Sequence, residues 1–303
     1  MNPSQPTLRQ LDAGYPKRLR ALPDAPPELH VRHGEDHAPA SPAWAHAEHS
    51  VAIVGARAAQ AEAVALARSL ARDLAGRGVV IVSGGALGVD AAAHRGALDS
   101  HAETGTGTTV AVLGCGIDVV YPAQHHGLYD DICAAGGALV SQFRPGAPPR
   151  PANFVRRNAV IAGLSDAVVV IGAGATSGAL HTAAAAHRLG RVVAAVPGSA
   201  GCDGLIAHGA AVVERAADVW QALAGQPRRP FADLPAPGSP AARVLALLHA
   251  EQACVCGDIA TRAGLSSREV ARALTGLELE GLAIPRPGQS YVRSALAEEL
   301  LAS

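Results

Sequence analysis

Aromatic residues and lysine are scarce in this chain of 303 residues. Phenylalanine, tryptophan and tyrosine together make up 3% of the sequence, Lys17 is the only lysine, and the formal net charge is −1. A balanced charge gives no overall positive field, which excludes a protein that attracts polyanions over its whole surface. Binding of nucleic acid would therefore depend on a local patch of arginines, with few aromatic rings on which bases could stack.

Paired cysteines and long apolar runs are also absent. The five cysteines are scattered and form no CxxC pair, which argues against a disulfide framework and against a zinc site. No apolar run reaches membrane-spanning length, and the polar N-terminus has no signal-peptide core. We therefore expect a reducing, cytoplasmic setting, with no metal, no cofactor and no membrane partner.

The chain does contain a repeated strand-and-helix pattern from Val51 onward. Helical segments separate most of a series of short apolar runs, at 51–54, 79–82, 109–113, 138–140, 167–171, 192–196 and 211–213. Continuous rather than alternating apolar runs indicate strands buried on both faces, which is typical of parallel sheets. The pattern predicts an α/β fold with a Rossmann-like, doubly wound, mostly parallel sheet, whose ligands bind beyond the carboxyl ends of the strands.

A glycine-rich loop follows the second of these strands. Val79–Val82 leads into Ser83, Gly84, Gly85 and Gly88, and Val89–His94 has the composition of a helix start. Backbone N–H groups at such a helix start, together with the helix dipole, make an anion site. A tight turn without a ligand is an equally good interpretation of this loop alone, and Asp90 is expected to cap the helix rather than act as a base.

Other groups at strand ends strengthen the case for an anion site. Gly55 and Arg57 end the first strand, and Gly172–Gly178, which includes Ser177, is a second glycine-rich turn. An arginine at this position can hold a phosphate through two hydrogen bonds, although an ordinary surface arginine is commoner. We predict that Arg57, Ser83, Gly84, Gly88 and Ser177 surround one phosphate pocket.

An arginine-rich stretch without acidic residues extends from Ser141 to Ser165. It contains Phe154 together with Arg144, Arg150, Arg156 and Arg157, and we expect it to form a loop. A ring between guanidinium groups suits single-stranded nucleic acid, because the ring stacks on a base while arginines contact phosphates. The alternative is structural, with Phe154 in the core and Arg157 holding the loop by hydrogen bonds.

The C-terminal part has a different organisation. Five prolines between 227 and 240 predict a linker over 226–240, which separates an N-terminal segment (1–50) and a sheet domain (51–225) from a small domain (241–303). Helices are predicted at 241–249, 256–263 and 267–280, followed by a hairpin around Pro287–Gly288. Three helices and a hairpin predict a winged helix.

Several motifs, taken in order, resemble the DNA-processing protein A (DprA, or Smf) family. They include Val51–Arg57 (VAIVGAR), Val110–Pro122 (VAVLGCGIDVVYP), Phe154–Asn158 (FVRRN) and Ser177–Ala183 (SGALHTA), and the resemblance covers nearly the whole chain. It implies a single-stranded DNA-binding protein of natural transformation that protects incoming DNA, assists loading of the RecA recombinase and forms a homodimer without catalysing a reaction. The expected contact residues are Gly55, Arg57, Ser83, Gly84, Gly85, Gly88, Phe154, Arg156, Arg157, Asn158, Ser177 and Gly178.

Departures from the family pattern leave other functions open. Leu87 and Gly172 stand where the family has arginine and glutamate, and a lost arginine–phosphate contact would cost roughly 1.5–3 kcal/mol. One alternative is a hydrolase of nucleoside monophosphates, although the turn Gly172–Gly178 lacks the glutamate which that chemistry needs. Another is a winged-helix regulator, although the helix 267–280 mixes Arg268 and Arg272 with glutamates and makes a poor duplex-binding face.

Overall fold

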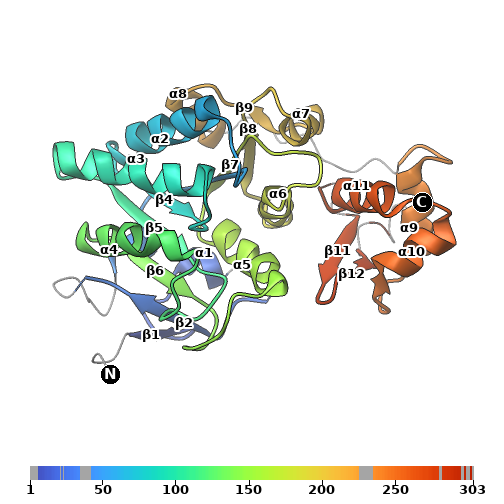
Figure 1. Cartoon of the computed structure of the whole chain (residues 1–303), viewed down its shortest axis with the longest axis horizontal. Helices are drawn as coiled ribbons and strands as arrows, with labels where there is room; N and C mark the ends of the chain where they lie inside the picture. The colour runs from blue at the N-terminus through green and yellow to red at the C-terminus, as the bar shows by residue number, and fades with distance from the viewer. Residues whose placement is uncertain are drawn as a thin grey trace.

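A nine-stranded sheet forms the larger part of the protein (Figure 1). The computed structural model describes residues 6–20, 22, 24–34, 42–224, 235–279, 282–294, 297 and 301. Strands lie in the order β1-β2-β6-β5-β4-β3-β7-β8-β9, and every neighbouring pair from β6 to β9 is parallel. The strands are β1 (Thr7–Arg9), β2 (Glu28–Arg32), β3 (Ser50–Gly55), β4 (Val80–Ser83), β5 (Thr108–Val112), β6 (Ala138–Ser141), β7 (Ala167–Ile171), β8 (Val192–Ala195) and β9 (Ala211–Val212).

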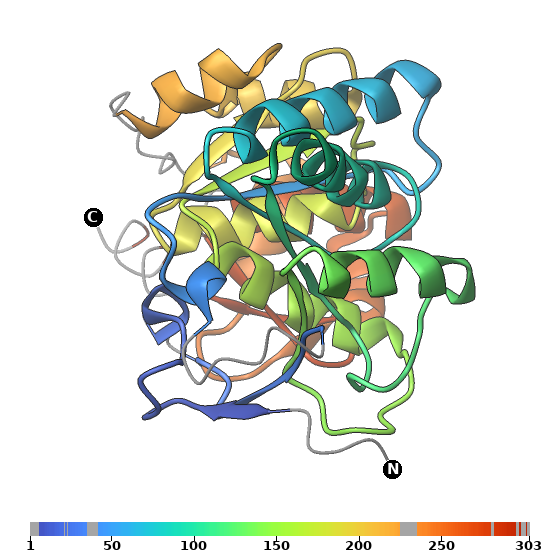
Figure 2. The same cartoon turned by 90° about the vertical axis from the view of Figure 1, so that its left-hand side faces the viewer.

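Helices cover both faces of this sheet, which confirms the doubly wound fold (Figure 2). One face packs against α2 (Ala61–Ala75), α3 (Val89–Thr104), α4 (His126–Ala134) and α8 (Ala216–Leu223). The other packs against α1 (Lys17–Arg20), η1 (Ala43–His46), α5 (Pro151–Gly163), α6 (Ala179–Arg188) and α7 (Ala200–Ala207). The short helix η2 (Ala123–His125) leads into α4. Because both faces are covered, the central strands β3, β4, β5 and β7 are buried at nearly every position, as their apolar runs predict.

The N-terminal segment extends the sheet instead of standing apart from it. Strand β2 pairs antiparallel with β6, and β1 pairs antiparallel with β2. The guanidinium of Arg18 on α1 binds both carboxylate oxygens of Asp166, at 2.7 and 2.9 Å, just before β7 begins. A two-bond arginine–carboxylate pair fixes position as well as charge, so it ties this segment to the middle of the sheet.

The C-terminal part forms a winged helix, as predicted. It contains α9 (Pro240–Leu247), α10 (Cys256–Ala263) and α11 (Ser267–Leu279), with a three-stranded sheet of β10 (Cys254–Val255), β12 (Ser290–Arg293) and β11 (Ala283–Arg286). Ser266 and Glu269 cap the start of α11 reciprocally, at 2.8 and 3.3 Å. The predicted linker 226–240 falls mostly on residues 225–234, which lie outside the described residues.

Three local predictions were wrong or incomplete. The arginine-rich stretch is not a loop, because Pro151 starts the helix α5, and no glycine or proline interrupts the helix before Gly163. The alternating stretch Leu29–Arg32 predicts a short edge strand, but β2 is an inner strand, since β1 covers it. The sequence did not predict two short strands, β1 and β10. They have three and two residues, which is too few to show a periodic pattern of apolar residues. No helix among the described residues is long and apolar enough to cross a membrane.

Candidate functional site

A hollow lies where the carboxyl ends of three parallel strands meet the start of α5. Its lining comes from the turns after β3, β4 and β5 and from α5 itself: Arg57, Gly84, Gly85, Ala86, Leu87, Gly114, Tyr121, Pro122, Phe154 and Arg157. The strand pattern predicts one crevice shared by the loops after Val54, Val82, Leu113 and Ile171, and the first three of these loops line the hollow. The fourth, after β7, is joined to this group through α5, because the amide of Asn158 donates to the carbonyl of Gly178 at 3.2 Å.

Arg157 forms the floor of the hollow. Its side chain is 4% exposed, and its Nη1 donates to the carbonyl oxygens of Gly84 and, at 2.5 Å, Val112. These are the first residue after β4 and the last residue of β5. One buried guanidinium therefore joins α5 to the ends of two strands, which matches the structural role considered for it above. Burial lowers the pKa of Arg157, and the nearby Asp90 carboxylate opposes that effect.

Asp90 organises the glycine-rich loop from inside. Its Oδ2 accepts hydrogen bonds from the N–H groups of Gly84 at 3.1 Å and Ala86 at 3.3 Å. Asp90 is in the first turn of α3, but its carboxylate binds the loop before the helix and no side chain caps α3, so the predicted capping role is wrong. Burial raises the pKa of this carboxyl group, while the charge of Arg157 acts in the opposite direction.

The inward bonds to Asp90 limit what the loop can offer a ligand. The N–H groups of Gly84 and Ala86 are occupied, so Gly85, Leu87 and Gly88 are the remaining loop candidates for an anion. The carbonyl of Gly85 is held as well, by His125 Nδ1 at 2.9 Å and by the Tyr129 hydroxyl at 3.2 Å. Buried side chains thus fix the loop before any ligand binds. A ligand therefore loses less free energy to ordering of the loop.

Glycine is required in this loop for two physical reasons. A Cβ on Gly84 would come within 2.4 Å of Arg157 Nη1, so any larger residue would displace the guanidinium. Gly88 has φ of +77°, and a Cβ there would lie 2.3 Å from the carbonyl oxygen of Ala56. The second contact brings the glycine-rich loop against the turn that carries Arg57.

Phe154 lines the hollow beside two guanidinium groups. The Cζ atoms of Arg57 and Arg157 are 5.6 and 5.7 Å from the centre of its ring. Tyr121 packs against the same ring, with centroids 5.5 Å apart and planes tilted by 43°. A Cβ on Gly114 would come within 2.5 Å of the Phe154 ring, so this glycine makes room for it. Phe154 is half-buried and Arg57 is exposed, which leaves both available at the surface of the hollow.

The structure separates the predicted contact residues into groups. Arg57, Gly84, Gly85, Phe154 and Arg157 line the hollow together. Ser83 does not, because it is fully buried and its hydroxyl donates to the carbonyl of Ile53 at 2.7 Å. The prediction of one pocket around five groups is therefore wrong for Ser83, whose hydroxyl joins β4 to β3.

The other predicted residues surround the hollow without lining it. Gly55 packs against the carbonyl of Ile171, where a Cβ would lie 2.0 Å away, and Gly88 packs against the Arg57 turn. Ser177 and Gly178 end the turn that leads into α6, next to Asn158. Arg156 points elsewhere, with its Cζ 5.6 Å from the ring centre of Phe143. A role of these residues in binding a ligand therefore stays a prediction.

Two exposed apolar side chains in the hollow were missed as candidates. Tyr121 is 42% exposed and Leu87 is 44% exposed. Large apolar groups usually avoid water at a concave site unless a partner covers them. The available signal was positional, because both residues follow strand ends: Leu87 within the glycine-rich loop and Tyr121 shortly after the turn at Gly114.

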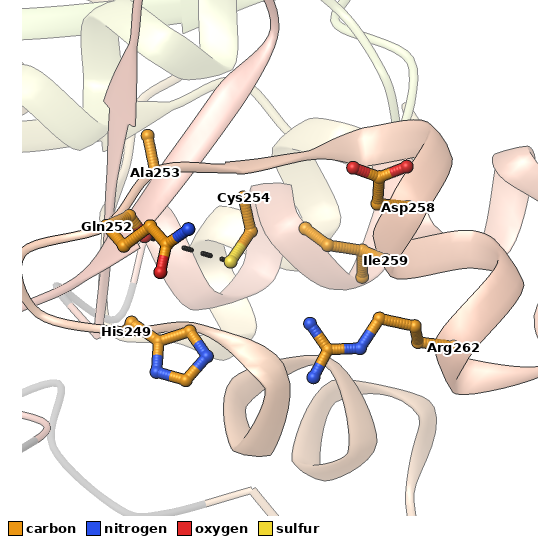
Figure 3. Close-up of a pocket in the computed structure, with 7 residues that line it drawn as sticks. All are labelled: His249, Gln252, Ala253, Cys254, Asp258, Ile259 and Arg262. Atoms are coloured by element: carbon orange, nitrogen blue, oxygen red, sulfur yellow. Dashed lines mark hydrogen bonds between the residues drawn. The ribbon is translucent and has the colours of Figure 1, made fainter.

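A second hollow lies in the winged helix and shows no comparable organisation. Figure 3 shows His249 and Arg262 on one side of it, with Cys254 of β10 on the other. His249, Asp258 and Arg262 are exposed, and among the described residues no group of three or more His, Cys, Asp or Glu could hold a metal ion. This hollow therefore carries no predicted chemistry.

The isolated histidines have structural partners. His94 is fully buried, its Nδ1 lies 2.7 Å from Thr109 Oγ1, and burial lowers its pKa to about 3, so it is neutral. His181 pairs with Glu278 at 2.8 Å. His94 and its threonine partner are both buried away from solvent, and His181 is held by a carboxylate, so both rings have packing roles.

Comparisons with known proteins match both parts of the chain. The family model described as DNA recombination-mediator protein A matches residues 7–224, and the DprA winged helix domain matches residues 227–289. A DNA processing protein DprA of Mycobacterium tuberculosis is 42% identical over 268 residues, covering 84% of this chain and 67% of that protein.

Two solved structures share the fold. DprA of Streptococcus pneumoniae has a TM-score of 0.63 at 35% identity, covering 72% of this chain and 74% of that one. DprA of Helicobacter pylori, whose structure is described for its single-stranded DNA binding mode, has a TM-score of 0.61 at 28% identity, covering 72% of this chain and 95% of that one. By sequence over most of its length and by structure, the chain belongs to the DNA recombination-mediator protein A (DprA) family.

Proposed function

We propose that this protein binds single-stranded DNA in the hollow around Phe154. The observation that carries the proposal is the half-buried Phe154 ring beside two guanidinium groups, next to exposed Tyr121 and Leu87. Aromatic and apolar surfaces accept unpaired bases of any sequence, and an exposed arginine beside them contacts the phosphate. The single-stranded DNA binding described for the H. pylori relative supports this assignment.

Three kinds of group have different roles in the proposed binding site. Phe154, with Tyr121 and Leu87 beside it, offers the surface on which a base stacks. Arg57 supplies the charge that reaches solvent, while Arg157 has its Nη1 occupied by carbonyl oxygens and holds the hollow in shape. The free N–H groups of Gly85 and Leu87 then complete a phosphate site. Nothing in this arrangement brings a nucleophile next to a base, so binding rather than catalysis is the proposed activity.

The proposed biological role follows from family membership. We infer that the protein takes part in DNA uptake by natural transformation, where it protects incoming DNA and assists loading of the RecA recombinase. A homodimer is part of the same proposal. The contact residues proposed outside the hollow are Gly55, Gly88, Arg156, Asn158, Ser177 and Gly178.

Replacing Arg57 by glutamine is expected to reduce the salt dependence of single-strand binding. Each phosphate neutralised on a single strand contributes about 0.7 to the slope of log K against log salt concentration. The slope of Arg57→Gln, measured by fluorescence anisotropy with labelled oligothymidylate at four salt concentrations, should be smaller than that of the unchanged protein by about 0.7.

Arg77→Gln is the matched control for this measurement. Arg77 is also an exposed arginine, but it lies before β4 and therefore at the opposite end of the strands. Its loss should leave the slope unchanged. An equal reduction in both variants would mean that the contribution of Arg57 is diffuse charge and not a phosphate contact.

A further inference from the structure

The winged helix contacts the sheet domain through a buried carboxylate. Glu278, in the C-terminal half of α11, is 1% exposed. Its Oε2 lies 2.8 Å from Nδ1 of His181, and its Oε1 accepts a hydrogen bond from Nη1 of Arg188 at 3.4 Å. Both partners are on α6, and Figure 1 shows α11 facing this helix. One carboxylate therefore joins the two parts of the protein.

A carboxylate this deeply buried needs positive partners. An isolated buried charge is strongly destabilising, whereas a paired and hydrogen-bonded one is tolerated. Burial alone would lower the pKa of His181, but the hydrogen bond and the charge of Glu278 outweigh burial and raise it. The raised pKa favours the protonated ring, so His181 and Arg188 together offset the charge of Glu278.

The apolar cores on either side of this contact are separate. Alanines of α6 face the core of the large sheet, while Val270, Leu274 and Leu277 of α11 belong to the core of the winged helix. Helices α6 and α11 each turn their apolar face to their own core. Glu278 of α11 contacts α6. The hydrogen bonds and charges of Glu278, His181 and Arg188 bridge these two cores.

We propose that Glu278, His181 and Arg188 form an intramolecular clamp that docks the winged helix on α6, so that α11 serves as a domain-docking helix. The major groove of duplex DNA, about 12 Å wide, admits one α-helix about 10–12 Å in diameter and not two packed side by side. In the docked state α11 cannot enter a groove along its full length. The clamp also fixes the winged helix on the helix that follows the second glycine-rich turn. The proposal does not depend on single-stranded DNA binding.

Reversing the charge at the centre of the clamp tests it. In Glu278→Arg, a cation faces His181 and Arg188, so the winged helix should leave α6 while both parts stay folded. Hydrogen–deuterium exchange of the full chain, read by mass spectrometry, should show roughly tenfold faster exchange in α6 and in the C-terminal half of α11. Exchange in α9, α10 and the central strands should not change.

Two further variants make the result decisive. Glu251→Arg introduces the same charge change at an exposed glutamate of the winged helix and should leave α6 protected. Combining Glu278→Arg with Arg188→Glu restores opposite charges across the contact and should restore protection. Unchanged exchange of α6 in Glu278→Arg would overturn the proposal. So would faster exchange throughout α9 and α10, because Glu278 would then support folding of the winged helix rather than docking.

Discussion

Replacing Arg157 by methionine is expected to lower the free energy of unfolding of the sheet domain by about 3–5 kcal/mol. Methionine keeps much of the side-chain length but removes the charge and the donors. The carbonyl oxygens of Gly84 and Val112 would lose their buried donor, and Asp90 would lose the cation that offsets its burial. Unsatisfied buried groups of this kind account for the largest effects of single substitutions.

Urea unfolding followed by tryptophan fluorescence measures this loss in the intended part of the chain. Both tryptophans, Trp44 and Trp220, precede the winged helix, so their signal reports the sheet domain. Arg156→Met is the matched control, because Arg156 is the exposed neighbour on the same helix, and its effect should stay within about 0.5 kcal/mol. Equal effects in the two variants would contradict the structural role assigned to Arg157.

Replacing Phe154 by alanine is expected to weaken single-strand binding by about 1–3 kcal/mol, a factor of roughly 5 to 150. Alanine removes the ring on which a base stacks but leaves Arg57 in place. The slope of log K against log salt concentration should therefore change little, in contrast to the effect of Arg57→Gln. Anisotropy titrations of both variants with the same labelled oligothymidylate distinguish loss of stacking from loss of charge.

Two other substitutions at Phe154 separate stacking from packing. Phe154→Tyr retains an aromatic ring and should keep most of the affinity. Phe154→Leu retains apolar bulk against Arg157 without the ring, and should bind weakly while unfolding at a urea concentration close to that of the unchanged protein. If Phe154→Leu binds as tightly as the unchanged protein, Phe154 acts through packing and the stacking role is wrong.

The sheet could be predicted from the sequence because its strands are buried on both faces. Val51–Val54 and Ala167–Ile171 are apolar at every position, and such runs have few alternatives in a chain with regularly spaced helices. The same reasoning located the winged helix, whose capping residues mark the start of α11. It failed for β1 and β10, which are strands only because neighbouring strands pair with them.

The candidate site was predictable in its location but not in its internal bonding. The rule that ligands bind at the carboxyl ends of parallel strands brought Arg57 and Gly84 to one hollow. The stretch around Phe154 forms a helix and not the expected loop, because Pro151 suits the first helical position and fixes the start of α5. That Arg157 and Asp90 turn inward depends on the depth at which α5 and α3 pack, and sequence patterns contain no measure of that depth.

The strand preference of the unchanged protein tests the central claim most directly. Anisotropy titrations with one labelled oligonucleotide, alone and annealed to its complement, give both affinities at two salt concentrations. A hollow that accepts one base beside Phe154 requires an unpaired strand, so the single strand should bind more tightly than the duplex at both concentrations. Equal or tighter binding of the duplex would contradict the account and assign DNA binding to the winged helix instead.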